Sequence, residues 1–163
     1  METELSYAGT RVIVTGAASG TGAATARRLV ELGAEVHTID IEKPDLRDIA
    51  SFTECDVRDP EQVDEAAKRI GRVVNMLFHC AGGGARDVAE AVIPLMSVGG
   101  AIVLVSASSS DADTADEVAS YTAARAETLE QDGIEIRLVR VDATVAASED
   151  QVWSVLNAAT RAD

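Results

Sequence analysis

At 163 residues, the chain is long enough for one hydrophobic core but too short for a nucleotide-binding domain plus a separate substrate domain, so we expect a single domain over residues 1–163. Apolar residues make up 47% of the chain and aromatic residues only 3%, a composition typical of helix-covered parallel sheets. The formal net charge of −14 argues against nucleic acids and anionic membranes as partners, because polyanions would be repelled.

The sequence indicates neither a membrane span nor a secretory signal. No apolar run approaches the roughly 20 residues that a span needs, and the N-terminal segment has neither the basic start nor the apolar stretch of a signal peptide. We therefore expect a cytoplasmic protein. The two cysteines, Cys55 and Cys80, form neither a disulfide framework nor a metal-ligand spacing, so we expect reduced packing residues and no metal site.

Strand and helix patterns alternate along the chain from Arg11 onward, which is the signature of βαβ units and a parallel sheet. We expect strands at residues 11–15, 35–40, 52–55, 73–79, 101–106 and 134–141. We expect helices at residues 21–32, 60–70, 86–96 and 121–131 and after Ser148. The sequence thus predicts a three-layer α/β fold, a Rossmann-type doubly wound parallel sheet of about six strands with the sixth near an edge.

Local signals sharpen two of these predictions. Asp59, Pro60 and Gln62 supply an N-cap, a favoured first helical residue and a reciprocal capping partner, and Ser148 with Gln151 forms a second capping box. In contrast, residues 106–117 are polar and acidic and lack the glycine and terminal Glu of an EF-hand, so we interpret them as a solvated loop.

A glycine-rich turn, TGAASGTG, lies between the first predicted strand and the first predicted helix, over residues 15–22. Such a turn lets backbone N–H groups approach phosphate oxygens, and the helix N-terminus adds about half a positive charge. Asp40 ends the next strand about 20 residues on, where a ribose-binding carboxylate is expected. A carboxylate repels a 2′-phosphate and no Arg follows it, which favours NAD over NADP; the alternative is that Asp40 is an ordinary solvated residue.

Four motifs in chain order resemble the short-chain dehydrogenase/reductase superfamily. They are TGAASGTG, the pair Asp56 and Val57, HCAGG at residues 79–83, and YTAAR at residues 121–125. The resemblance covers nearly the whole chain from Arg11, and the first half is most similar to members that act on hydroxysteroids and aromatic alcohols. It implies a shortened member that lacks the usual last strand of the family.

The resemblance also implies which residues bind the cofactor and which react. The implied NAD-binding residues are Gly16, Ser19, Gly20, Thr21, Gly22, Asp40, Asp56, Val57, Ala81 and Gly82. In the family, a Tyr exchanges a proton with the substrate, a Ser orients the reacting oxygen, and a Lys four residues after the Tyr lowers its pKa. These roles fall on Tyr121, on Ser108 or its neighbours Ala107 and Ser109, and on Arg125, which replaces the Lys.

The implied function is NAD-dependent interconversion of a small-molecule alcohol and a ketone or aldehyde. The chain departs from the family at Arg125 and at His79 and Cys80, which stand where the family has two Asn and which we interpret as packed strand-end residues. Because Arg does not replace Lys neutrally, two alternatives stay open: a catalytically impaired NAD-binding subunit that pairs with an active family member, and a scaffold without a substrate. We expect a homo-oligomer or a hetero-oligomer with another family subunit.

Overall fold

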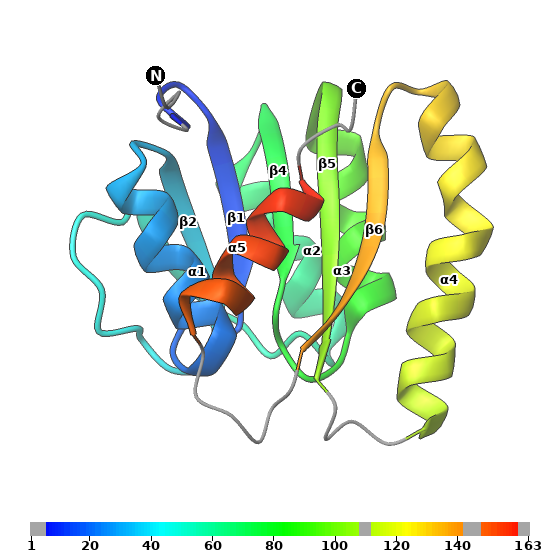
Figure 1. The fold of residues 1–163 in the computed structure, drawn as a ribbon, viewed down its shortest axis with the longest axis horizontal. Coiled ribbons are helices and arrows are strands. Elements are labelled where there is room, and N and C mark those ends of the chain that lie inside the picture. Colours follow the sequence, from blue (N-terminus) through cyan, green and yellow to red (C-terminus); the bar gives the residue numbers. More distant parts are fainter. Residues whose placement is uncertain (1–5, 108–111, 142–147, 160–163) are drawn as a thin grey trace.

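A six-stranded, entirely parallel sheet forms the centre of the protein, in the order β3-β2-β1-β4-β5-β6 (Figure 1). The fold is described from a computed structural model over residues 6–107, 112–141 and 148–159. The strands are β1 (Arg11–Thr15), β2 (Glu35–Asp40), β3 (Ser51–Glu54), β4 (Val74–His79), β5 (Met96–Ala107) and β6 (Glu135–Val141). The helices are α1 (Gly20–Glu31), α2 (Pro60–Ile70), α3 (Ala85–Val92), α4 (Ala112–Gln131) and α5 (Glu149–Ala158).

The strand order reverses between β1 and β4, which confirms the predicted doubly wound α/β fold. The chain runs outward from β1 through β2 to β3, then returns to the other side of β1 and runs outward again through β5 to β6. In such sheets, ligands bind at the carboxyl ends of the strands on either side of the reversal. Here these ends are Thr15 and His79, which are paired in register.

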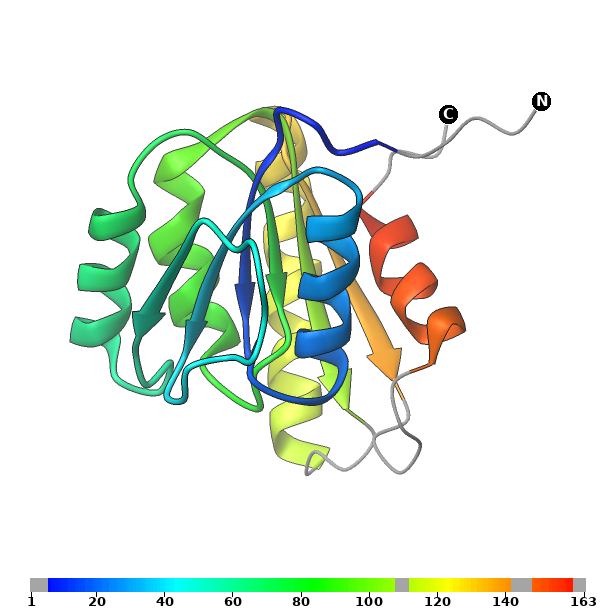
Figure 2. The same ribbon diagram turned by 90° about the vertical axis from the view of Figure 1, so that its left-hand side faces the viewer.

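Helices cover both faces of the sheet, and the alternation of side chains along the strands produces two cores. Figure 2 shows α1 and α5 together on one side of the sheet, with α2 and α3 on the other. Val12 and Val14 pack under α1 and α5, whereas Ile13 between them joins the core that includes Leu129 of α4. This alternation is what a strand that is buried on both faces requires.

The helix predicted over residues 86–96 is shorter than expected. The α-helix ends at Val92, a 3₁₀ turn covers Ile93–Leu95, and β5 begins at Met96 rather than at residue 101. The cause is Pro94, which has no N–H to continue the helical hydrogen-bond ladder. The extra length of β5 is paired, since Met96 lies opposite Val74.

The interpretation of residues 106–117 as a loop is wrong for its second part. The helix α4 begins at Ala112, so Asp116 and Glu117 lie on a helix and not in a loop. Asp116 and Glu117 are exposed to solvent, as the interpretation expected. Although α4 spans 20 residues, no helix within the described ranges is long and apolar enough to cross a membrane.

Candidate functional site

The glycine-rich turn after β1 packs directly against the end of β4. Gly16 has a φ of +68°, and a Cβ atom there would lie 2.8 Å from the backbone nitrogen of Ala81. A Cβ on Gly22 would lie 2.0 Å from the carbonyl oxygen of Gly16. Only glycine fits these two positions, so the start of α1 packs closely against the turn and the end of β4. The first N–H groups of a helix have no partner within the helix, and the Ser19 side chain does not cap them here.

Asp40 ends β2 and is bonded to the glycine-rich turn. Its Oδ2 accepts a hydrogen bond of 3.0 Å from the backbone N–H of Ala18, and its Oδ1 accepts one of 3.0 Å from Glu42. The side chain is therefore more than an ordinary solvated residue, because it ties the turn to the end of the neighbouring strand. Both oxygens keep a lone pair for hydroxyl donors.

Asp56 follows β3 and is fixed by the start of α2. Its backbone N–H donates to Gln62 Oε1 at 2.8 Å, and its Oδ1 accepts from the N–H of Arg58 at 2.9 Å. We expected Gln62 to cap the N–H of Asp59, but that N–H donates to the Asp56 carbonyl at 3.0 Å. The N-cap itself is confirmed, since Asp59 Oδ1 accepts from Glu61 at 3.1 Å.

Most of the residues predicted to bind the cofactor line one cleft of about 370 Å³ at the carboxyl edge of the sheet. The predicted residues in its wall are Gly16, Ser19, Asp40, Asp56, Val57, Ala81 and Gly82. Gly20, Thr21 and Gly22 are not in the wall and form the first turn of α1. The cleft also includes residues that sequence reasoning missed, namely Ile39, Ile41, Cys55, Arg58, Cys80 and Gly83.

The chemistry of this first cleft suits the adenosine end of a dinucleotide. Its volume lies in the usual range for small-molecule sites. The exposed side chain of Ile41 offers apolar surface, two carboxylates accept hydrogen bonds, and the start of α1 favours phosphate. A signal for Ile41 and Arg58 existed in the sequence, because they directly follow Asp40 and the pair Asp56 and Val57.

His79, the last residue of β4, links three segments at the bottom of the site. The Gly83 carbonyl can only accept, so Nε2 of His79 carries a hydrogen and donates to it at 2.7 Å. In the neutral ring Nδ1 is then the acceptor, and the Thr15 hydroxyl donates to it at 2.8 Å while Thr15 Oγ1 accepts the backbone N–H of Cys80 at 3.0 Å. Complete burial lowers the pKa of His79 to about 4, so the ring is neutral at physiological pH and acts as a bridge.

Both cysteines are free thiols, as expected. Burial raises the pKa of Cys80 to about 12 and also raises the pKa of Cys55, where the nearby carboxylates of Asp56 and Asp59 add to the effect. Since the thiolate is the reactive form, neither cysteine is suited to act as a nucleophile at neutral pH.

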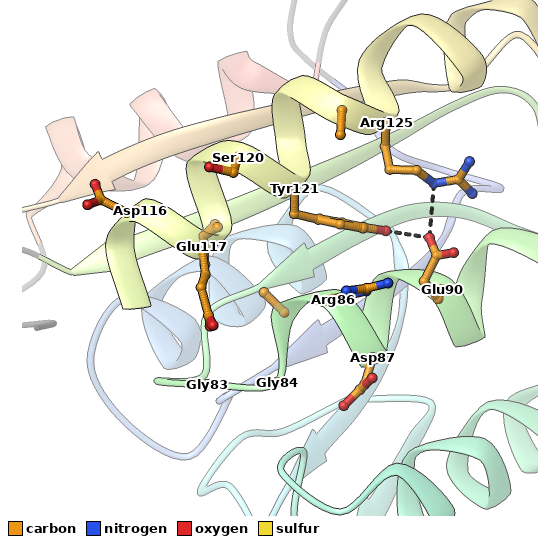
Figure 3. A pocket seen from close by; sticks show the side chains of 13 residues that line it. Gly83, Gly84, Arg86, Asp87, Glu90, Asp116, Glu117, Ser120, Tyr121 and Arg125 are labelled. Atoms are coloured by element: carbon orange, nitrogen blue, oxygen red, sulfur yellow. Dashed lines mark hydrogen bonds and ion pairs between the residues drawn. The ribbon is translucent and has the colours of Figure 1, made fainter. Parts of the chain in front are cut away.

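A second, larger cleft of about 1030 Å³ lies between α3 and α4 (Figure 3). Its wall contains Gly83, Gly84, Ala85, Arg86, Asp87, Glu90, Asp116, Glu117, Val118, Ser120, Tyr121, Ala124 and Arg125. Gly83 also lines the first cleft, so the two clefts meet there. The structure therefore places the predicted residues Tyr121 and Arg125 in the second cleft, next to the first cleft, which the predicted cofactor residues line.

Tyr121 and Arg125 share one acceptor, Glu90 of α3 (Figure 3). The Tyr121 hydroxyl donates to Glu90 Oε2 at 2.5 Å, and Arg125 Nε donates to the same oxygen at 3.0 Å. Arg125 also donates to Thr128 Oγ1 at 3.2 Å. Sequence reasoning missed Glu90, and no local signal could have revealed it, because the contact needs α3 and α4 to lie face to face.

These contacts change the acidity of Tyr121 in an unexpected direction. Burial, together with the hydrogen bond to Glu90 and its negative charge, raises the pKa of the Tyr121 phenol, and Arg125 only partly opposes this. The family role requires the reverse, a tyrosine whose pKa is lowered by a cation. The predicted Ser108 and its alternative Ser109 lie outside the described residues, and Ala107 is the last residue of β5.

Comparisons with known proteins relate the chain to short-chain dehydrogenases. The sequence profile of the family described as short chain dehydrogenase matches residues 10–92, just over half of the chain. Coniferyl-alcohol dehydrogenase of Pseudomonas sp. (strain HR199 / DSM 7063) is 32% identical over 111 residues, which cover 59% of this chain and 43% of that enzyme. The chain thus matches less than half the length of this relative.

Solved structures of the same class share the fold. The 2-keto-3-deoxy-D-gluconate dehydrogenase of Streptococcus agalactiae superimposes with a TM-score of 0.71 at 21% identity, covering 82% of this chain and 68% of that one. A short-chain type dehydrogenase/reductase from Mycobacterium ulcerans gives 0.75 at 20% identity, with coverage of 90% and 74%. At these identities, the structures support the fold alone.

Proposed function

Because the chain belongs to the short chain dehydrogenase family, we propose that it is an NAD-dependent oxidoreductase that interconverts an alcohol and a ketone or aldehyde by hydride transfer. One observation carries this proposal: the cleft lined by the predicted NAD-binding residues meets the cleft that contains Tyr121, with Gly83 in both walls. A dinucleotide in the first cleft can present its nicotinamide to a substrate in the second.

Each part of the first cleft has a proposed role toward the dinucleotide. The N–H groups at the start of α1 would bind the pyrophosphate, and Asp40 would accept hydrogen bonds from the adenosine ribose. Asp56 and Val57 would contact the adenine. The bound nicotinamide would supply or accept the hydride, and the protein would position the substrate and exchange the proton.

The proposed preference for NAD can be tested by substituting Asp40. We expect NADH, followed by the fluorescence of Trp153, to bind the unmodified chain at least about tenfold more tightly than NADPH, because the Asp40 carboxylate repels the 2′-phosphate. In Asp40→Asn, which keeps an oxygen acceptor for the Ala18 N–H, the ratio of the NADPH to the NADH dissociation constant should fall toward one. Equal binding of the two cofactors to the unmodified chain contradicts the role of Asp40.

The proposed activity is tested by oxidation of NADH in the presence of a panel of aldehydes and ketones. Turnover by the purified chain supports the proposal. Binding of NADH without turnover of any of these compounds contradicts it and favours the catalytically impaired subunit. Assembly with further copies of the chain, or with a related subunit, stays a prediction that the molar mass in solution would test.

A further inference from the structure

The carboxylate of Glu90 lies where it can accept the phenolic proton of Tyr121. The phenolic hydroxyl donates a hydrogen bond to Glu90 Oε2, with the two oxygens 2.5 Å apart, and a carboxylate acceptor makes this bond charge-assisted. The Glu90 side chain is 45% exposed and faces the larger cleft, so it can exchange a proton with solvent. The side chain of its partner, Tyr121, is partly buried.

The proposed reaction needs such an acceptor. An alcohol that loses a hydride to nicotinamide must also lose its hydroxyl proton, and a neutral tyrosine can take that proton only if it releases its own. In the family, a lysine four residues along the helix helps by favouring the tyrosinate. Arg125 stands at that position, but its Nε points at Glu90 and another nitrogen of its side chain at Thr128.

We propose that Glu90 is the proton acceptor for Tyr121 in alcohol oxidation and the proton donor to it in carbonyl reduction, and that Arg125 positions the Glu90 carboxylate. This inference rests on the function proposed above. It assigns to a residue on α3 the task that the lysine performs in other members, and it gives Arg125 a role that does not require its deprotonation.

The proton and electron balance of the step is complete. In oxidation, the substrate hydroxyl proton moves to Tyr121 Oη while the phenolic proton moves to Glu90 Oε2. With NAD⁺ bound, the carbon of the alcohol would transfer a hydride to it, the C–O bond would become a carbonyl, and the products would be a ketone or aldehyde, NADH and a protonated Glu90. Glu90 then releases its proton to water in the cleft, and reduction follows the reverse order.

The other charged groups of the cleft do not replace Glu90 in this arrangement. Arg86 and Asp87 lie on the same helix, and Asp116 and Glu117 line the cleft from α4. None of these four has a hydrogen bond to Tyr121 among the contacts of the described residues, whereas Glu90 contacts both members of the pair.

Glu90→Gln tests the proposal, because it keeps the shape of the side chain but removes its capacity to take a proton. We expect the turnover number for the carbonyl panel to fall by about 10² or more, the loss typical of a missing acid–base group, with NADH affinity unchanged. Glu127→Gln is the matched control: Glu127 is exposed on α4, outside the cleft, and its variant should turn over like the unmodified chain. A loss smaller than about tenfold in Glu90→Gln, or a gain, overturns the proposal.

A spectroscopic titration separates this inference from the proposed function. The absorbance of the Tyr121 phenol is obtained by subtracting the spectrum of the same protein carrying Tyr121→Phe. The pKa of Tyr121 measured in this way should be lower in Glu90→Gln than in the unmodified chain, because a carboxylate acceptor and its charge are removed. If the unmodified chain binds NADH but never turns over, the proposed function fails. If the pKa of Tyr121 is instead the same in both proteins, the contact with Glu90 itself is refuted.

Discussion

The two clefts that meet at Gly83 are built in different ways. The first is made mostly by backbone: the glycine-rich turn contacts the end of β4 so closely that any side chain at Gly16 or Gly22 would overlap main-chain atoms. The second is made by charged and polar side chains that reach across two helices, and its central contact is the carboxylate of Glu90. Backbone packing fixes the first cleft tightly, whereas single substitutions can rearrange the second.

In the proposed function, the first cleft binds the dinucleotide and the second cleft carries out the proton transfer. A substitution in the second cleft should change turnover and leave dinucleotide affinity intact, because the predicted NAD-binding residues lie around the first cleft. A substitution at the glycine-rich turn should weaken binding and also destabilise the fold, because the turn is part of the core. Single substitutions in each cleft test whether the two clefts are independent.

The largest effect is expected for Tyr121→Phe. Removal of the proton-transferring hydroxyl should lower the turnover number by about 10² to 10⁴, and NADH should bind with unchanged affinity. Turnover and Trp153 fluorescence measure the two quantities separately. A loss of NADH binding in this variant would show that the two clefts are not independent.

Tyr7→Phe provides the matched control for Tyr121→Phe. Tyr7 is buried, and its hydroxyl has no hydrogen-bond partner among the described residues, so its removal should be tolerated. We expect the variant to keep the turnover and the NADH affinity of the unmodified chain. A comparable loss in both variants would mean that the loss in Tyr121→Phe reflects general disturbance of the fold.

A strong dependence of stability on pH is expected from His79. Its pKa is about 4 in the folded chain and about 6.5 when exposed, so the unfolded chain binds more protons between these values. The stability contributed by the neutral ring is therefore present above pH 6.5 and lost as the pH falls toward 4, by roughly 3 kcal/mol in total.

Urea unfolding of the unmodified chain and of His79→Asn, measured across this pH range, would test the prediction. Asn, the residue that the family has at this position, can still bridge Thr15 and Gly83 but does not titrate. The free energy of unfolding of the variant should therefore fall less steeply in acid. Equal slopes for the two proteins would rule out a buried neutral His79.

A smaller effect is expected for Gly22→Ala. The added Cβ would lie 2.0 Å from the Gly16 carbonyl oxygen, so the turn must move. We expect the free energy of unfolding to fall by about 1 to 3 kcal/mol, with weaker NADH binding. Gly82→Ala is the matched control for stability, because a Cβ there meets no atom within 4 Å. Equal stability of both variants would contradict the close packing of the turn.

The fold and the first cleft could be predicted from the sequence because their signals are local. Alternating strand and helix patterns predicted the sheet, and the N-caps at Asp59 and Ser148 were confirmed. The errors were also local: the start of α4 lies in a polar segment that resembles a loop, and Pro94 ends α3 early. Both errors concern the ends of elements, where short-range preferences nearly balance.

The sequence alone determined the glycine-rich turn, the carboxylates at the end of β2 and after β3, and the positions of Tyr121 and Arg125, because each is recorded in residue type and spacing. Only the tertiary structure decided what these groups contact. It placed Glu90 between Tyr121 and Arg125, and it buried His79 as a neutral bridge. The physical reason is that pKa and hydrogen bonding depend on neighbours from other helices and strands, which no local pattern specifies.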